Sequence, residues 1–326
     1  MRMKTLIAAT MLLLGRAPAA LAHGVVGQRF FPATLSIDDP FVADEMSLPT
    51  VQGARLKGTD EAPTTYQTEI SAELSKRLSR YLGLSLGGAL LVQDQRGGST
   101  IAGFDNLEVS LKYQFLSDPE HELLMSAGLE ADVGGTGQQR VGAESFSTVA
   151  PTFFFGKGMG DLPDAVPFLK PVAITGAFGL NFPTQEHTTT TTIEDDQVVT
   201  DRQLNPRTID WGFSLQYSLQ YLQSYVQDVG LAAPFNRMIP LVEFAMTSAV
   251  QGPGKTAGSV NPGVIWFGRH IQLSAEAVIP VNGNALDEAP QPHVGFIAQL
   301  HLYLDDIWPE VFTWTPFDGV LGPTQP

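Results

Sequence analysis

A strict alternation of apolar and polar residues over 207–221 constrains the fold of this chain more than any other feature of its sequence. Apolar or aromatic residues take every second position from Ile209 to Tyr221, and polar residues or glycine lie between them. A period of two is typical of a β-strand with one apolar face. Average soluble strands have about 5–6 residues, whereas a tilted strand needs about 9–11 to cross a bilayer. The pattern therefore indicates a strand long enough to span a membrane.

The same period recurs along most of the chain. It gives eleven candidate strands, at 66–76, 82–92, 106–116, 122–133, 145–155, 168–181, 207–221, 240–250, 257–267, 270–281 and 293–304. Proline lacks the N–H that a sheet ladder needs. We therefore expect bulges or shortened strands at Pro151, Pro171, Pro262 and Pro280.

The connections between these strands alternate in length. Short turns follow the first, third and ninth strands, whereas longer polar links follow the second, fourth, sixth and tenth. The polar run 187–203 in one of these links is expected to be a mobile outer loop. Outer-membrane barrels have short periplasmic turns and long outer loops. Closing the barrel with both ends in the periplasm needs one more strand within 26–60, near SLPTVQGARLKG.

This arrangement predicts an all-β protein, a transmembrane antiparallel up-and-down β-barrel of twelve strands. Ten strands is the alternative, if two of the proline-bearing segments do not cross. A soluble β-sandwich would need a hydrophobic core, but the second face of these strands is made of Gly, Ser, Thr, Gln and carboxylates. An apolar face toward lipid and a polar face toward a lumen account for both sets of residues.

Residues 1–22 have the three parts of a secretory signal peptide. Arg2 and Lys4 precede the apolar run Leu6 to Leu14, and Ala20-Leu21-Ala22 forms a small-x-small cleavage site. This pattern predicts export and, with the barrel, a bacterial outer-membrane location. The expected organisation is 1–22 signal peptide, 23–60 N-terminal segment (a lumen plug or the first strand), 61–304 barrel, and 305–326 C-terminal periplasmic tail.

Composition excludes several classes of site and partner. The absence of Cys excludes a disulfide scaffold, a thiolate metal centre and a thiol nucleophile. The net charge of -15 argues against a nucleic-acid partner. We expect no cofactor, and we expect that the protein is not an enzyme, because no GxSxG elbow is present. A lipid-hydrolysing barrel is the alternative, and its candidates would be Ser126, Ser214, Ser274 and His301.

Placing the polar face inward brings eight carboxylates and one amine to the lumen. These lumen-lining residues are Glu69, Glu73, Glu108, Glu130, Asp132, Asp210, Glu243 and Glu276, with Lys112 as the amine. Acidic linings attract cations, as in cation-selective pores. The alternative is an ordinary wet face whose charges are paired with one another or with arginines of the loops.

Two further groups are candidate metal ligands. Cleavage after Ala22 would make His23 the first residue, and its amine and imidazole suit Cu(II). The remaining histidines lack metal-ligand spacing, so copper binding by His23 is a minor alternative. The acidic residues Asp38, Asp39, Asp44 and Glu45 lack the spacing and glycine of a calcium loop, and we expect a solvated turn there.

The strand MSAGLEADVG, the segment NPGVIWFGRHIQLSAEAVIPVN and the run HVGFIAQLHLYLDDIWP resemble outer-membrane β-barrel proteins. These proteins are grouped with the family named for the phenol-degradation meta-pathway (MetA-pathway). The resemblance covers most of the chain after the signal peptide and includes no catalytic motif. It implies an outer-membrane location and transport of small or aromatic compounds. Many barrels end on an aromatic residue of their last strand, whereas this chain continues, so either its assembly signal is internal or Val311–Phe317 forms a further edge segment.

These observations predict a passive channel or uptake protein for small solutes, cationic or aromatic. Its partners would be outer-membrane lipid and, during biogenesis, the barrel-assembly machinery. The alternative is a non-conducting barrel with a partner-binding or structural role, filled by side chains or by residues 23–60. Barrels of about eight strands are filled and those of about sixteen are open, so twelve strands are compatible with both. The sequence defines neither the solute nor the oligomeric state.

Overall fold

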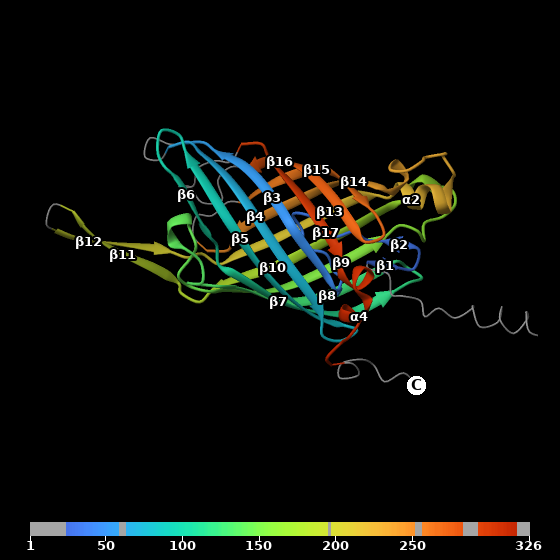
Figure 1. Ribbon diagram of the computed structural model, residues 1–326, viewed down its shortest axis with the longest axis horizontal. Helices are drawn as coiled ribbons and strands as arrows, with labels where there is room; N and C mark the ends of the chain where they lie inside the picture. Colours follow the sequence, from blue (N-terminus) through green and yellow to red (C-terminus); the bar gives the residue numbers. More distant parts are fainter. Residues whose placement is uncertain (1–23, 59–62, 195–196, 252–255, 283–292, 318–326) are drawn as a thin grey trace, which may run out of the picture.

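The computed structural model describes residues 24–58, 63–194, 197–251, 256–282 and 293–317. Twelve antiparallel strands form a closed barrel (Figure 1). In order around the barrel they are β3 (Glu45–Leu56), β4 (Thr65–Arg77), β5 (Leu82–Gln95), β7 (Leu107–Asp118), β8 (Leu123–Val133), β9 (Thr148–Gly158), β10 (Val172–Pro183), β13 (Thr208–Tyr217), β14 (Met238–Ala249), β15 (Thr256–Phe267), β16 (Ile271–Asn282) and β17 (Gly295–Tyr303). Pairing of β17 with β3 closes the sheet. The predicted barrel of twelve strands is confirmed.

The remaining elements lie at the two ends of the barrel. One end carries the short β4–β5, β7–β8 and β15–β16 turns and is called the turn end below; the opposite end is the loop end. At the loop end, β6 (Thr100–Phe104) pairs with β5, and β11 (His187–Glu194) and β12 (Gln197–Leu204) form a hairpin that projects beyond the barrel (Figure 1). Shorter elements are β1 (Val25–Val26), β2 (Arg29–Phe30), α2 (Leu219–Tyr221), η3 (Leu222–Val226), α3 (Leu304–Ile307) and α4 (Pro309–Phe312). No helix within the described ranges is long and apolar enough to cross a membrane.

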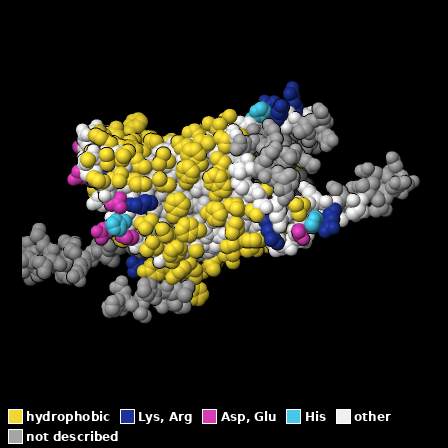
Figure 2. Space-filling model, turned by 180° about the vertical axis from the view of Figure 1, so that it is seen from behind, with side chains coloured by type: hydrophobic (Ala, Val, Ile, Leu, Met, Phe, Trp, Pro, Cys, Tyr) yellow, Lys and Arg dark blue, Asp and Glu magenta, His cyan; other side chains and the backbone are white. Residues whose placement is uncertain are grey.

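Large apolar side chains cover the outside of the barrel wall. Leu129 is 51 % exposed and Phe296 is 52 % exposed, and similar outward positions occur on most strands. Figure 2 shows these side chains as a broad band, with charged residues gathered near the two ends. Soluble monomers rarely expose apolar patches larger than a few hundred Å². The outer face is therefore suited to lipid, as the alternation of residues predicts.

Two segments differ from the sequence expectation. The predicted strand 207–221 ends at Tyr217, because Ser218 caps α2 by accepting a hydrogen bond from the Tyr221 N–H (3.1 Å). Tyr221 is consequently buried instead of lipid-facing. The run 187–203, predicted to be a mobile outer loop, includes most of the β11–β12 hairpin at the loop end, and its mobility stays a prediction. Its β-branched threonines favour an extended backbone.

The prolines affect the ladder unequally. Pro171 precedes β10, and the β15–β16 register shifts beside Pro280, as expected. The expectation was wrong for Pro151 and Pro262, where strand register continues without a shift. After β17, the described residues of 304–317 include two short helices and no further strand, so Val311–Phe317 is not an edge segment.

Ile70 and Glu69 on β4 provide a test of which face meets lipid. Ile70 lies near the middle of the strand with its side chain 40 % exposed, and Glu69 points to the other face. Ile70→Arg should impair insertion, because a lipid-facing Arg near the midplane costs about 2–4 kcal/mol. Glu69→Arg should insert normally, since its charge enters a polar lumen. The fraction of heat-modifiable protein in membranes measures insertion, and equal losses for both variants would show that the faces are reversed.

Candidate functional site

Residues 24–44, called the N-terminal segment below, lie inside the barrel. Ser126 of β8 donates a hydrogen bond to the Pro40 carbonyl, and Gln272 of β16 donates one to the Ala33 carbonyl (2.6 Å). Phe31 is only 1 % exposed. Because β8 and β16 belong to distant parts of the barrel wall, the segment spans the lumen between them.

The segment enters the lumen from the turn end and returns to it. Arg29 contacts Glu122 in the β7–β8 turn, and Asp44 contacts Arg77 at the end of β4. Between these points, Ser36 donates its N–H to Glu243, the sixth residue of the twelve-residue strand β14 (2.6 Å). The segment therefore reaches about half the height of the wall and occupies the turn-end half of the lumen.

Arg29 anchors the first part of the segment. Its guanidinium is 3.2 Å from the Glu122 carboxylate, donates to the Pro171 carbonyl (2.8 Å), and lies 3.9 Å from the ring centroid of Tyr221. Burial, and then the negative charge of Glu122, raise the pKa of Tyr221 to about 12. The Tyr221 hydroxyl therefore stays neutral beside this buried ion pair at ordinary pH.

Asp44 anchors the other end of the segment. This fully buried carboxylate accepts hydrogen bonds from Lys76 Nζ (2.7 Å), Arg77 Nε (2.7 Å) and the Arg77 N–H (2.9 Å). Arg77 also pairs with Asp305 in α3 (2.7 Å). The network joins the segment to β4 and to the chain after the last strand. The prediction of a solvated acidic turn was wrong here, because lysine and arginine of β4 neutralise the buried charge.

Lys112 of β7 contacts the part of the segment that lies between Ser36 and Asp44. Its Nζ lies 2.6 Å from an Asp38 carboxylate oxygen and 2.7 Å from the Asp39 carbonyl, and 4.5 Å from the ring centroid of Phe154. The one amine predicted for the lumen is therefore engaged by the segment. It does not neutralise the wall carboxylates by direct pairing.

The predicted lumen carboxylates lie in three parts of the wall. Glu69 and Glu73 are on β4, and Glu108, Glu130 and Asp132 are on the neighbouring strands β7 and β8, where Glu108 is opposite Asp132. Asp210 on β13 accepts from Asn181 and from Thr247, each at 2.6 Å. Glu243 and Glu276 are buried at the tip of the N-terminal segment. Between residues that the structure describes, no ion pair includes any of these eight carboxylates.

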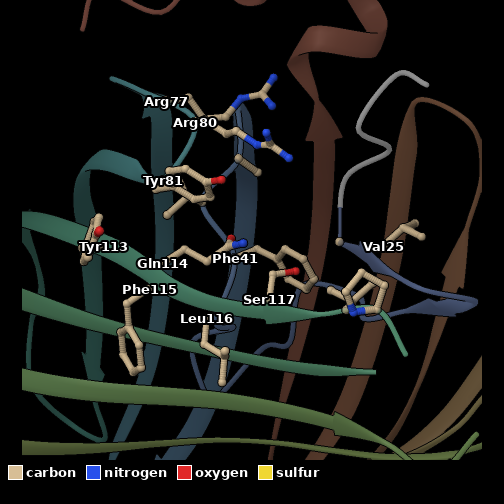
Figure 3. Close-up of a pocket in the computed structure, with 15 residues that line it drawn as sticks. Val25, Phe41, Arg77, Arg80, Tyr81, Tyr113, Gln114, Phe115, Leu116 and Ser117 are labelled. Atoms are coloured by element: carbon tan, nitrogen blue, oxygen red, sulfur yellow. The ribbon is translucent and has the colours of Figure 1, made fainter. Parts of the chain in front are cut away.

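A cavity of about 400 Å³ opens beside the N-terminal segment at the turn end (Figure 3). The last pair between β5 and β7 is Leu82 with Tyr113, and β7 continues beyond this pair without β5 beside it. The cavity lies at this position. Its walls combine guanidinium groups with aromatic rings, and the labelled lining residues include Phe41, Arg77, Arg80, Tyr81, Tyr113 and Phe115. This surface differs chemically from the acidic wall nearer the loop end.

The candidates for hydrolysis are not assembled into a catalytic set. None of the three candidate serines has a hydrogen bond to a histidine among the described residues. Ser126 contacts Pro40, Ser214 contacts Gln216, and Ser274 contacts Gln272. His301 Nδ1 is 2.9 Å from Ser47 Oγ, and its Nε2 is 3.2 Å from Glu45. In serine hydrolases of the trypsin type the nucleophile contacts Nε2, so the ring is reversed here.

The structure describes only some of the residues that were predicted as candidate metal ligands. No group of three or more His, Asp and Glu side chains in the described ranges could hold a metal ion. His23, the copper candidate, and the signal peptide 1–22 lie outside the described residues.

Comparison with known proteins agrees with the barrel. An outer-membrane channel from Pseudomonas putida F1 is 11 % identical, with a TM-score of 0.50, and the match covers 84 % of this chain and 99 % of that chain. The translocator domain of the autotransporter NalP from Neisseria meningitidis is 9 % identical, with a TM-score of 0.45, over 92 % of this chain and 97 % of that chain. At 11 % identity the match to the Pseudomonas channel shows a shared fold alone: the chain has the fold of an outer-membrane β-barrel.

Two other comparisons found no match. No family model matches the chain, and no curated protein matches it. Membership of the MetA-pathway family therefore stays a prediction from the resemblance of the strands.

The sequence offered residues 23–60 as a lumen plug or as the first strand, but it did not predict which side chains of this segment contact the wall. Arg29, Ser36 and Asp38 attracted no prediction as contacts because the N-terminal segment has no strand period. The available signal was indirect: aromatic and acidic residues are concentrated just before the first strand, as in FFPATLSIDDPF.

Proposed function

We propose that this protein is an outer-membrane channel for small solutes, that its lumen favours cations, and that the N-terminal segment closes it on the periplasmic side. The turn end then lies in the periplasm, as in barrels with short periplasmic turns. The observation that supports this proposal most is the chemistry of the inner wall. Carboxylates line the wall, and none of them is in an ion pair between described residues. The amine of Lys112 is paired with Asp38.

The acidic wall determines which solutes are favoured. Glu69, Glu108 and Asp132 lie toward the loop end, above the part of the lumen that the segment fills. Fixed negative charges in a narrow polar space raise the local concentration of cations and oppose anions. Cationic or neutral small molecules are therefore favoured over anionic ones at this entrance.

The N-terminal segment determines when solutes pass. Its ion pairs at both ends and its contacts with opposite walls hold it across the turn-end half of the lumen. A solute wider than water and small ions needs displacement of this segment to reach the periplasm. The second candidate function is that of a non-conducting barrel with a structural or partner-binding role, in which the segment never moves. The filling of the turn-end half of the lumen also supports this alternative.

Ion selectivity tests the channel proposal. Glu108 and Glu130 lie on the neighbouring strands β7 and β8, and both should point into the lumen. Changing both to Gln should lower cation preference in dilute salt and have little effect at about 1 M, where the Debye length falls to about 3 Å. Reversal potentials in a planar bilayer with a salt gradient measure this preference.

The measurement should be made on the full-length mature chain and on a chain lacking residues 24–37. Heat-modifiable migration on gels confirms that each variant is folded. Anion selectivity would contradict the acidic-lumen proposal. Absence of conductance in both chains would favour the non-conducting barrel.

A further inference from the structure

The deepest point of the N-terminal segment meets a group of oxygen atoms contributed by three neighbouring strands. Glu243 of β14 accepts the Ser36 N–H (2.6 Å), and Asn261 of β15 donates its Nδ2 to Ser36 Oγ (2.7 Å). Ser36 Oγ is also 3.5 Å from the carboxylate of Glu276 on β16. Glu243 and Asn261 are directly opposite in the β14–β15 ladder. Three wall side chains therefore converge on one serine.

Glu243 and Glu276 contact each other, and when both are ionised each of the three wall side chains has an oxygen that no N–H or O–H donor reaches. The atoms are Glu243 Oε1, Glu276 Oε1 and Asn261 Oδ1, and all three are buried. Glu243 is 0 % exposed, Asn261 1 % and Glu276 5 %. Buried polar atoms in native proteins nearly always have a partner, whether protein, water or an ion. No lysine or arginine within the described residues forms an ion pair with either carboxylate.

The backbone around Glu276 leaves room for this arrangement. Glu276 is opposite Gly263 in the β15–β16 ladder, and a Cβ at position 263 would overlap the Glu276 side chain. The glycine thus allows Glu276 to lie across β15 toward Glu243. A larger residue there would push the carboxylate away from the group.

From this convergence we propose a calcium site formed by Glu243, Glu276, Asn261 and Ser36. Its ligands would be carboxylate, amide and hydroxyl oxygens, which are the donors that Ca²⁺ prefers. A divalent cation neutralises both carboxylates and also supplies a partner for the Asn261 oxygen, whereas one proton shared by the two carboxylates leaves that oxygen unpartnered. Ca²⁺ accepts six to eight oxygens in flexible geometry, so lumen water completes its shell, while Mg²⁺ requires a stricter octahedron.

The site has a structural consequence that is independent of whether the barrel conducts. Ser36 belongs to the N-terminal segment, and the other ligands belong to the wall. A bound ion therefore fastens the deepest part of the segment to β14, β15 and β16. The proposal goes beyond the channel function and does not depend on it.

Calorimetric titration with CaCl₂ tests the site on the full-length mature protein in detergent, after removal of metal with a chelator. We expect one Ca²⁺ per chain and clearly weaker binding of Mg²⁺. Glu243→Gln and Glu276→Gln should each weaken Ca²⁺ binding by about tenfold or more, because affinity follows the charge of the ligands. Glu130→Gln removes a wall carboxylate on another strand, β8, and should leave the affinity unchanged.

Asn261→Asp protects this test against effects of misfolding, because it adds a negative ligand and should tighten Ca²⁺ binding. A merely destabilised variant would not show tighter binding. Absence of Ca²⁺ binding by the folded wild type would overturn the proposal. So would equal affinities in the wild type, Glu243→Gln and Glu276→Gln, since the ion would then be bound elsewhere.

Discussion

Deletion of residues 24–37 should raise the single-channel conductance of the barrel by about an order of magnitude or more, because the open section of a pore governs ion passage. These residues include the Arg29 anchor and the deepest contact, Ser36, and they contact the β7–β8 turn, β14 and β16. Their removal leaves Asp38 to Asp44 along the wall, so Lys112 and Arg77 keep their carboxylate partners. Planar-bilayer recording of the two purified proteins measures the change.

The barrel itself should survive this deletion. Its ladder closes between β3 and β17 and includes no residue before Glu45. Heat-modifiable migration provides the folding control. A conductance equal to that of the wild type would mean that the segment is not the barrier, and would direct attention to the loop end.

Replacement of Asp44 with Ala should destabilise the barrel by about 3 kcal/mol, the lower end of the cost of removing one partner from a buried ion pair. Asp44 is fully buried and accepts from Lys76 and from Arg77. The lower end applies because both cations keep other partners: Asp305 for Arg77, and the carbonyls of Phe312 and Trp314 for Lys76. The shift in the urea midpoint of tryptophan fluorescence in lipid vesicles measures the loss.

Asp164→Ala is the matched control for this prediction. Asp164 also pairs with a lysine, Lys170, but its side chain is almost wholly exposed. Exposed ion pairs contribute little to stability. Asp164→Ala should therefore leave the midpoint unchanged. A comparable shift in both variants would show that burial of Asp44 is unimportant.

Strand number and the apolar face followed from the sequence because both depend on local alternation. In β13, each apolar residue from Ile209 to Leu215 lies on the outer face, as the period of two requires. The same local rule failed at Tyr221, where alternation continues into a segment that Ser218 turns into a helix. Alternation alone does not mark where a strand stops.

The contents of the lumen could not be predicted in this way. Arg29 meets Glu122 across 93 positions of the chain, and Ser36 meets Glu243 across 207. Such pairs depend on how the whole sheet closes, and neither Arg29 nor Ser36 belongs to a periodic pattern. The carboxylates of the wall were visible because they alternate with lipid-facing residues. Their partners in the N-terminal segment were not.

Closure of the β3–β17 seam has a consequence for the order of folding. The seam joins Thr50 to Gln299, which are separated by 249 positions, so the first strand cannot complete its pairing until the last strand is in place. Contacts between distant residues pay a large loop-closure entropy and form slowly. While the sheet is still open, the N-terminal segment can settle on its inner surface from the side. After β3 and β17 have paired, the segment can enter the lumen only through an end of the closed barrel. The rate at which the segment fills the lumen therefore depends on the rate at which the barrel closes.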